Sequence, residues 1–309
     1  MSVDIRSNAL AELVDEAVTV ERIGAGFWFT EGPVWNPSGQ FLLFSDVPGN
    51  IRRRWDERDG VRTVAAPTSK GNGMTLDADL RLLVCEHTTS VVSRMEGDGT
   101  GAGRRALASH FEGRALNSPN DLAVHSDGSI YFTDPAAGRT PEHGLAPRPR
   151  ELDYQGVFRL TPAGEVQLQV ADMAGPNGLC FAPDESVLYV NDTPRSHIRA
   201  FPVLPGGQLG EGRVFADAIG EFRPERGAGQ GGLVDGMKCD ERGNVWVTGP
   251  GGLWVFSAEG EHLGGVRIPE SAGNLHWGGP DWNWLYVCAG TGLYRFPTRV
   301  AGRREPFMR

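Results

Sequence analysis

Six polar residues stand directly before hydrophobic stretches of the sequence, at intervals of 39 to 58 residues. Two carboxylates and four carboxamides, brought together by a fold, would form a ring of oxygen ligands for a hard divalent cation. Ca²⁺ suits such a ring best because it accepts many irregularly placed oxygen ligands, whereas Zn²⁺ prefers nitrogen or sulfur. Zn²⁺, Mn²⁺ and Mg²⁺ are the alternatives. The six residues are Glu31, Asn72, Asn120, Asn177, Asp235 and Asn274.

Each of these polar residues begins the same local pattern. An apolar strand follows, then a turn rich in Asp, Gly or Pro, and then a second strand, as in Asn177, the turn at 183–185 and the strand at 186–192. Units of about 40 to 50 residues with three or four strands each are typical of propeller blades. The sequence therefore predicts an all-β fold, a six-bladed β-propeller.

The two ends of the repeat array predict how the ring closes. A linear array would leave a bare sheet edge at each end, whereas a ring removes both edges. We expect the strand at 18–23 to complete the last blade beside residues 292–296. The domains are then an N-terminal extension with a short helix over 9–17 (residues 1–17), the propeller (18–300) and a C-terminal tail (301–309).

A propeller would bring the six polar residues to one place, because the first strand of each blade lines the central channel. The second strand runs back to the same mouth, so the residues at its end are expected nearby. We expect substrate contacts from Asn72, Asn120, Asn274, His87, Asp134 and Asp192, with Asp46 close to them.

The same residues have a simpler interpretation as turn formers, since Asn-Gly and Asp-Gly are common turn signals. Turn chemistry accounts for each Asn or Gly alone, but it does not account for Glu31 in the same register. The glycine-rich run 227–232 neither follows a strand nor opens a helix, so it is expected to be a flexible lip of the channel and not a dinucleotide loop.

Composition excludes several classes of protein. The 309 residues include 43 Gly and 21 Pro, which suit many short strands, and the formal charge of −9 has no basic patch for nucleic acid or an anionic membrane. The N-terminal residues lack a signal-peptide pattern, and no run of about 18 apolar residues predicts a membrane span. Four scattered cysteines suit buried, reduced thiols. We expect a cytoplasmic monomer or dimer.

Several motifs in fixed order resemble the gluconolactonase, senescence-marker-protein and luciferin-regenerating-enzyme family, especially its bacterial sugar lactonases. They are FTEGPVW at 29–35, LNSPND at 116–121, YFTDP at 131–135, PNGL at 176–179 and VDGM at 234–237. The resemblance spans residues 18–297 and implies a six-bladed propeller with one catalytic divalent cation, usually Ca²⁺. It implies that Glu31, Asn177 and Asp235 hold this metal and that Asn120 reaches the metal or the substrate.

Two departures from the family pattern leave the substrate open. Ser118 stands where animal members carry an arginine that contacts sugar, and residues 136–139 lack the aromatic that bacterial relatives often show. Our hypothesis is a metal-dependent hydrolase that opens a sugar lactone such as gluconolactone, a small-molecule substrate, to the hydroxy acid.

In this hypothesis the cation acts as a Lewis acid, Asp235 receives the proton of the attacking water, and Asn120 positions the carbonyl. Asp192 or His87 is the alternative base, because a metal-bound carboxylate is a poor one. The alternative functions are an ester or phosphotriester hydrolase on the same metal and a non-enzymatic, Ca²⁺-braced binding propeller.

Overall fold

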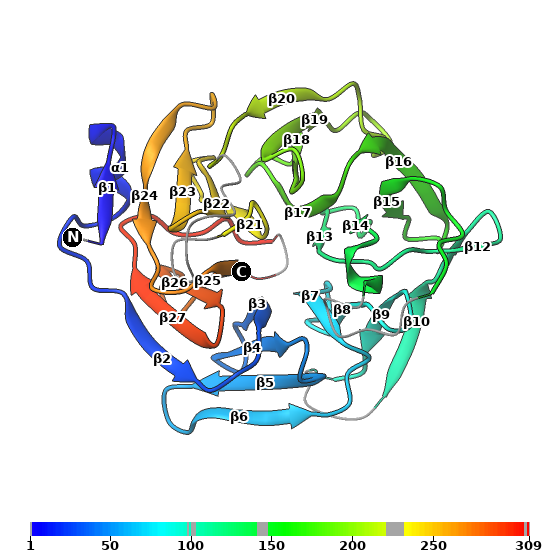
Figure 1. Ribbon diagram of the computed structural model, residues 1–309, viewed down its shortest axis with the longest axis horizontal. Helices are drawn as coiled ribbons and strands as arrows, with labels where there is room; N and C mark the ends of the chain where they lie inside the picture. Colours follow the sequence, from blue (N-terminus) through cyan, green and yellow to red (C-terminus); the bar gives the residue numbers. More distant parts are fainter. Residues whose placement is uncertain are drawn as a thin grey trace.

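Six antiparallel sheets are arranged around a central axis in this computed structural model, which describes residues 2–97, 99, 103–140, 148–220, 232–305 and 308 (Figure 1). Blade 1 contains β3 (Thr30–Asn36), β4 (Phe41–Asp46), β5 (Ile51–Asp56) and β6 (Gly60–Ala65). Blade 2 contains β7 (Gly71–Leu76), β8 (Leu82–Glu86), β9 (Val91–Met95) and β10 (Arg104–Ala108). Blade 3 contains β13 (Leu122–Val124), β14 (Ile130–Asp134), β15 (Gln155–Leu160) and β16 (Val166–Met173).

The second half of the chain repeats this arrangement. Blade 4 contains β17 (Pro176–Phe181), β18 (Val187–Asp192), β19 (His197–Pro202) and β20 (Arg213–Ala216). Blade 5 contains β21 (Met237–Cys239), β22 (Val245–Gly249), β23 (Gly252–Phe256) and β24 (His262–Arg267), and blade 6 contains β25 (Ala272–Gly278), β26 (Trp284–Ala289) and β27 (Gly292–Pro297). The predicted six-bladed propeller is confirmed.

The N-terminal strand closes the ring as predicted. Strand β2 (Glu21–Ala25) pairs antiparallel with β27, with Arg22 opposite Tyr294, and so becomes the outer strand of blade 6. It begins and ends two or three residues later than the predicted strand. The helix α1 (Asn8–Leu13) is shorter than predicted, and the strand β1 (Val3–Ile5) was not predicted at all; it adds a fifth strand to blade 5 beside β24.

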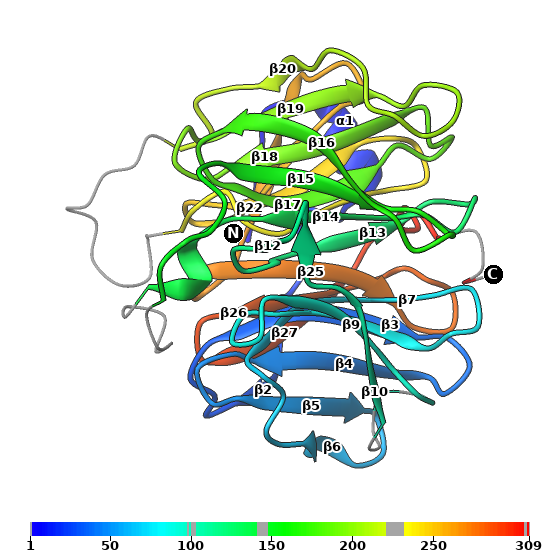
Figure 2. The same cartoon turned by 90° about the vertical axis from the view of Figure 1, so that its right-hand side faces the viewer.

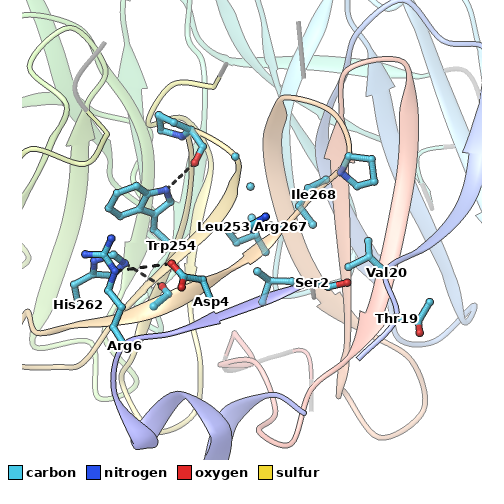
Figure 3. Close-up of a pocket in the computed structure, with 17 residues that line it drawn as sticks. Ser2, Asp4, Arg6, Thr19, Val20, Leu253, Trp254, His262, Arg267 and Ile268 are labelled. Carbon is cyan, nitrogen blue, oxygen red and sulfur yellow. Dashed lines mark hydrogen bonds and ion pairs between the residues drawn. The ribbon is translucent and has the colours of Figure 1, made fainter. Parts of the chain in front are cut away.

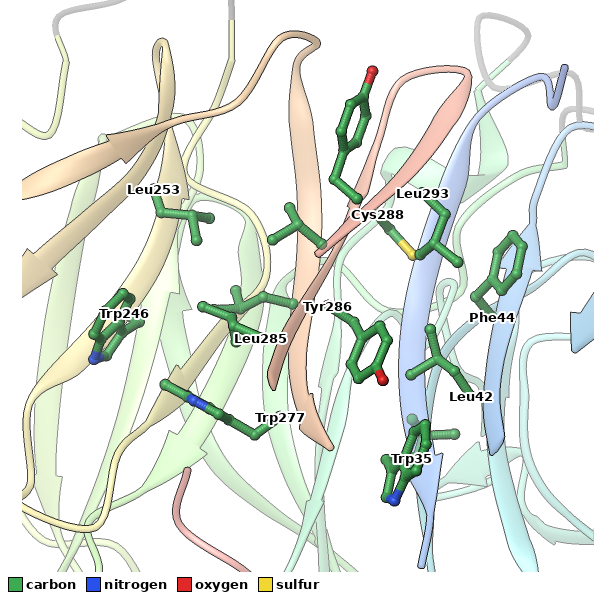
Figure 4. Packing of buried hydrophobic residues seen from close by; sticks show 14 of the residues in the cluster. Trp35, Leu42, Phe44, Trp246, Leu253, Trp277, Leu285, Tyr286, Cys288 and Leu293 are labelled. Carbon is green, nitrogen blue, oxygen red and sulfur yellow. The ribbon is translucent and has the colours of Figure 1, made fainter. Parts of the chain in front are cut away.

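Large side chains packed between the sheets form the core. Each face of an inner strand lies against a neighbouring blade, so these strands are buried on both faces and are mostly apolar, as in the run Phe41–Phe44. Where the ring closes, Trp35 of blade 1 stacks on Tyr286 of blade 6 with ring centroids 5.4 Å apart, and Trp246 meets Trp277 edge to face at 5.5 Å (Figure 4).

The described residues of the C-terminal tail cross one end of the channel. Gly302 forms a bridge with Asp240, and Thr75 donates a 3.1 Å hydrogen bond to Glu305. Met308 is buried, and the described part of the tail lies near the axis of the ring, at one of its two faces (Figures 1 and 2). This end lies at the C-terminal side of the innermost strands, opposite the six polar residues. Residues 306, 307 and 309 lie outside the described part.

Three smaller elements complete the structure: the pair β11 (His110–Phe111) and β12 (Arg114–Ala115), and the 3-10 helix η1 (Ala137–Arg139).

Within the described ranges, no helix is long and apolar enough to cross a membrane. All four cysteines are buried and free. Of the glycine-rich run at 227–232, only Gly232 lies inside the described ranges.

Candidate metal and substrate site

A β-bulge interrupts the innermost strand of four blades next to the polar residues predicted from the sequence. The register shifts between Glu31 and Val34 in β3, between Gly71 and Met74 in β7, between Pro176 and Leu179 in β17, and between Ala272 and Asn274 in β25. A bulge bends its strand and redirects the side chains beside it. The polar residues therefore leave the regular alternation that packs their neighbours between the blades.

A glycine follows four of the six polar residues and allows two blades to come close together. A Cβ atom on Gly73 would lie 2.5 Å from the carbonyl oxygen of Asn120, and one on Gly178 would lie 2.2 Å from that of Asp235. Gly32 and Gly236 are equally confined by the blade that follows. These glycines lie in or beside the innermost strands, so their interpretation as hairpin turn signals is wrong.

A set of side-chain donors joins three of the blades to the blade that follows, and it was not predicted. Ser45 donates to the carbonyl oxygen of Asn72 at 2.9 Å, Thr133 to that of Asn177 at 2.7 Å, and Asn191 to that of Asp235. Each donor directly precedes the last aspartate of its second strand, in Ser45-Asp46, Thr133-Asp134 and Asn191-Asp192. That small polar residue is the sequence signal that could have revealed this set.

Glu31 and Asp235 form a buried, electrostatically coupled pair. Glu31 is 4% exposed; its Oε2 accepts a 2.8 Å hydrogen bond from Gly32, and burial raises its pKa to about 7. Burial, and then the charges of Glu31 and Asp121, raise the pKa of Asp235 well above its usual range, which a hydrogen bond with Asn177 partly opposes. Such a pair holds its negative charge far more easily beside a cation.

Three of the six polar residues that begin the repeats present a buried oxygen acceptor that has no hydrogen-bond partner among the described residues: Glu31 Oε1, Asn72 Oδ1 and Asn177 Oδ1. Asp134 Oδ1, at the end of a second strand, is a fourth such acceptor among the predicted site residues. A buried unpaired acceptor costs about 1–3 kcal/mol unless a ligand satisfies it. Acceptors without donors are what a cation needs, so these residues fit a hard divalent ion. No group of three His, Cys, Asp or Glu side chains in the described ranges is arranged for a metal, so the carboxamides are needed to complete the set.

A second polar cluster adjoins Glu31 and Asp235. Asn274 donates from Nδ2 to Asp121 Oδ2 at 3.5 Å, and Lys238 Nζ lies 3.8 Å from the same oxygen. Sequence reasoning placed Asn274 here but missed Asp121 and Lys238. Asp121 follows Asn120 in the LNSPND motif, and Lys238 lies three residues after Asp235, so their positions in the repeat were the available signal.

The carboxylates at the ends of the second strands are occupied by backbone groups. Asp192 accepts hydrogen bonds from the N–H groups of Ala174 and Gly175 at 2.8 and 3.1 Å, and Asp134 accepts one from Asn117 at 2.8 Å. Both carboxylates are fully buried, and burial raises the pKa of Asp134 to about 7. They fix the loops that lead into the innermost strands of their own blades, as Asp46 does in blade 1.

His87 and Asn120 lie closer to the channel. His87 Nε2 is 3.2 Å from Asn72 Nδ2, and the backbone of Gly138 in η1 packs against the imidazole ring. Asn120 is 9% exposed, and its carbonyl oxygen accepts the hydrogen bond from Gly73. The Asn120 N–H donates to Thr133, so the backbone of Asn120 is held on both sides.

A cavity of about 730 Å³ lies away from the channel, on the outer flank of blade 5 beside β1 (Figure 3). Its polar groups are engaged with one another: Asp4 pairs with Arg6 at 3.9 Å, and His262 stacks on Trp254 and bonds to Gly264. It contains none of the six polar residues that begin the repeats.

Fold and site together define a six-bladed propeller with a cluster of buried carboxylate and carboxamide oxygens in its channel. The model of the SMP-30/Gluconolactonase/LRE-like region matches residues 29–291, and the chain belongs to this family. It is 34% identical over 275 residues to a gluconolactonase of Zymomonas mobilis, covering 84% of this chain and 75% of that protein. It is 28% identical over 273 residues to the pentonolactonase XacC of Haloferax volcanii, covering 85% and 81%.

Solved structures agree with this assignment. A gluconolactonase from Xanthomonas campestris superposes with a TM-score of 0.86 at 33% identity, over 96% of this chain and 95% of that one. Regucalcin from Agrobacterium tumefaciens, a calcium-binding protein, shares the fold with a TM-score of 0.74 at 19% identity, over 92% and 94%.

Proposed function

We propose that this lactonase uses one divalent cation, Ca²⁺ by preference, to open sugar lactones such as D-glucono-1,5-lactone to their hydroxy acids. The observation that carries the proposal is the buried pair Glu31 and Asp235 beside acceptor oxygens that lack donors, in a chain of the gluconolactonase family. The gluconolactonase and pentonolactonase among its relatives support a sugar lactone as the substrate class.

Glu31, Asn177 and Asp235 would hold the cation, with Asn120 at its open side. Two carboxylates and a carboxamide leave positions for water and substrate around an ion that takes six to eight oxygens. When bound, the cation supplies Lewis acidity at the lactone carbonyl and stabilises the negative charge that develops on its oxygen.

The side chains supply orientation and proton transfer. The Asn120 carboxamide donates to the carbonyl oxygen, which gains charge in the transition state. Asp235 accepts the proton of the attacking water, although a carboxylate that also held the cation would be a weaker base than a free one. The ring C–O bond breaks, and the ring oxygen leaves as a hydroxyl after taking up a proton.

His87 is the second candidate base, since it adjoins Asn72 in the channel. Asp192 is less suited, because both its oxygens already accept backbone N–H groups. Asn72 and His87 would contact the sugar hydroxyls. Asn274, Asp134 and Asp192 would keep the wall of the channel and its loops in position.

The first experiment is hydrolysis of D-glucono-1,5-lactone, followed by proton release, with chelator-stripped protein and with Ca²⁺, Zn²⁺, Mn²⁺ or Mg²⁺ restored. We expect activity to disappear on stripping and to return most fully with Ca²⁺. Turnover no faster than the spontaneous background with every metal would rule out simple sugar lactones.

A parallel series of aryl esters and phosphotriesters separates the other hydrolase functions, because a lactonase is much more efficient on aldonolactones. An ion that binds without turnover of any of these substrates would favour the binding propeller. The proposal includes a cytoplasmic location, which suits four free cysteines.

A further inference from the structure

Lys238 is placed among carboxylates in the channel. It follows β21's first residue, Met237, whose carbonyl oxygen accepts a 3.1 Å hydrogen bond from the Lys238 ammonium. The ammonium also lies 3.8 Å from Asp121 Oδ2, and the Lys238 side chain is only 22% exposed. A cation this confined is costly to bury unless a carboxylate compensates it.

The partner of Lys238 is Asp121. Asp121 is 1% exposed, its Oδ1 accepts a 2.9 Å hydrogen bond from Leu122, and its Oδ2 faces both Lys238 and Asn274. Lys238 also acts electrostatically on Glu31 and on Glu305 of the C-terminal tail, which has Thr75 as a hydrogen-bond donor and Arg303 as its stronger electrostatic partner. Among the described carboxylates, the one within ion-pair distance of the Lys238 ammonium is Asp121.

The charges of this cluster have a definite sum. Glu31, Asp121 and Asp235 carry three negative charges when ionised, and Lys238 carries one positive charge, which leaves a net charge of −2. That is the charge that one divalent cation neutralises. Without Asp121, the ammonium would oppose the cation at close range in a medium of low dielectric constant.

We propose that Asp121 and Lys238 form a buried ion pair that sets the charge of the metal site, with Asp121 as the positioning residue that shields the cation from Lys238. The inference rests on the proposed function, because it assumes that Glu31 and Asp235 hold a divalent ion. Neither Asp121 nor Lys238 binds the metal; the pair acts through its charge and through Asn274.

The test is a double-mutant cycle with Ca²⁺ affinity measured by titration calorimetry. D121N removes the negative charge that compensates Lys238, so that the ammonium repels the cation. We expect this variant to weaken Ca²⁺ binding on the order of tenfold or more. K238M removes a positive charge and should not weaken binding. The double variant D121N/K238M should return to within about threefold of the wild type. D172N, which removes a surface carboxylate paired with Arg199 on blade 4, is the matched control and should leave the affinity unchanged.

Unfolding of the same four proteins in chelator gives a second, metal-free measurement. D121N should lower the melting temperature, and the double variant should recover part of the loss. Unchanged Ca²⁺ affinity in D121N would overturn the proposal. An equal loss of affinity in D121N and in the double variant would also overturn it, because Asp121 would then be a ligand of the metal. A wild type that binds no divalent cation would overturn the metal centre itself, whereas the melting cycle still reports on the ion pair.

Discussion

The backbone N–H of Gly73 donates a 2.8 Å hydrogen bond to the carbonyl oxygen of Asn120, which joins the innermost strand of blade 2 to the candidate site residue of blade 3. A side chain at position 73 would break this contact, because a Cβ atom would meet the Asn120 oxygen at 2.5 Å and Asp121 Oδ1 at 2.6 Å. The position of the site residues thus depends on close approach between blades.

Gly73→Ala is expected to destabilise the protein by roughly 1–3 kcal/mol through overpacking against backbone atoms. It should also weaken lactone hydrolysis, because Asn120 has to move. Urea unfolding in chelator measures the stability. Gly210→Ala is the control, since a Cβ there would meet Leu204 at an ordinary 3.5 Å and should change the stability little. An equal loss of stability in the two variants would show that the close approach of blades 2 and 3 does not depend on glycine at position 73.

Glu31→Gln and Asp235→Asn each remove one of the two negative charges proposed to hold the cation. Each variant is expected to lose on the order of a hundredfold in Ca²⁺ affinity and most of its lactonase activity, because charged ligands set calcium affinity. Calorimetry and proton-release assays measure the two losses. Glu12→Gln, in the exposed helix α1, is the control. Wild-type affinity and activity in either ligand variant would disprove the assignment.

Asp134 should make the stability of the protein depend on pH. Its pKa is about 7 in the folded protein, because of burial, and near 4 in the unfolded chain. Between these values the folded state binds the extra proton, so stability falls as pH rises, by roughly 1.4 kcal/mol per pH unit from this group, and levels off above pH 7.

Asp134→Asn removes this dependence while keeping an acceptor for Asn117. The variant should therefore gain stability relative to the wild type as the pH is raised from about 5 to 8, in chelator-treated protein. Thermal melts at several pH values test this. A constant difference between the two proteins across the range would mean that Asp134 is ionised in the folded state throughout.

Arg303 anchors the C-terminal tail to blade 4. Its guanidinium lies 2.7 Å from Glu185, and both side chains are about one-tenth exposed. Arg303→Met should cost roughly 2 kcal/mol, because it removes the guanidinium from a largely buried carboxylate and leaves it the Ser126 N–H and His125 as partners. Arg299→Met is the comparison: its pair with Asp15 is half exposed, and it should cost about 1 kcal/mol or less. Similar losses in chemical denaturation would show that the tail contributes no more than a surface contact.

The sequence predicted the ring because every repeat shows the same features in the same order: a polar residue, an apolar strand, a turn and a second strand. It predicted the closing strand because an unpaired sheet edge has to be covered. It could not predict β1, since the three residues Val3–Ile5 are too short to show a period.

The site was predictable as a set of side chains but not as a set of contacts. Glu31, Asn177 and Asp235 follow from their place in the repeat, whereas the pairing of Asp121 with Lys238 depends on strands from blades 3 and 5 meeting at the axis. The same limit explains Asp192. Its position at the end of β18 was predicted correctly, but its occupation by Ala174 and Gly175 depends on the path of the preceding loop.

The pairing of β2 with β27 has a consequence for how the protein is made. Residues 21–25 are synthesised before the strands of blades 1 to 5, yet their partners in β27 are synthesised after them. The earlier blades can form one after another during translation, since each pairs strands that are close in sequence. Blade 6 cannot be completed until β27 has been synthesised. The first strand of the ring therefore waits for its partner while all the strands of the five other blades are made.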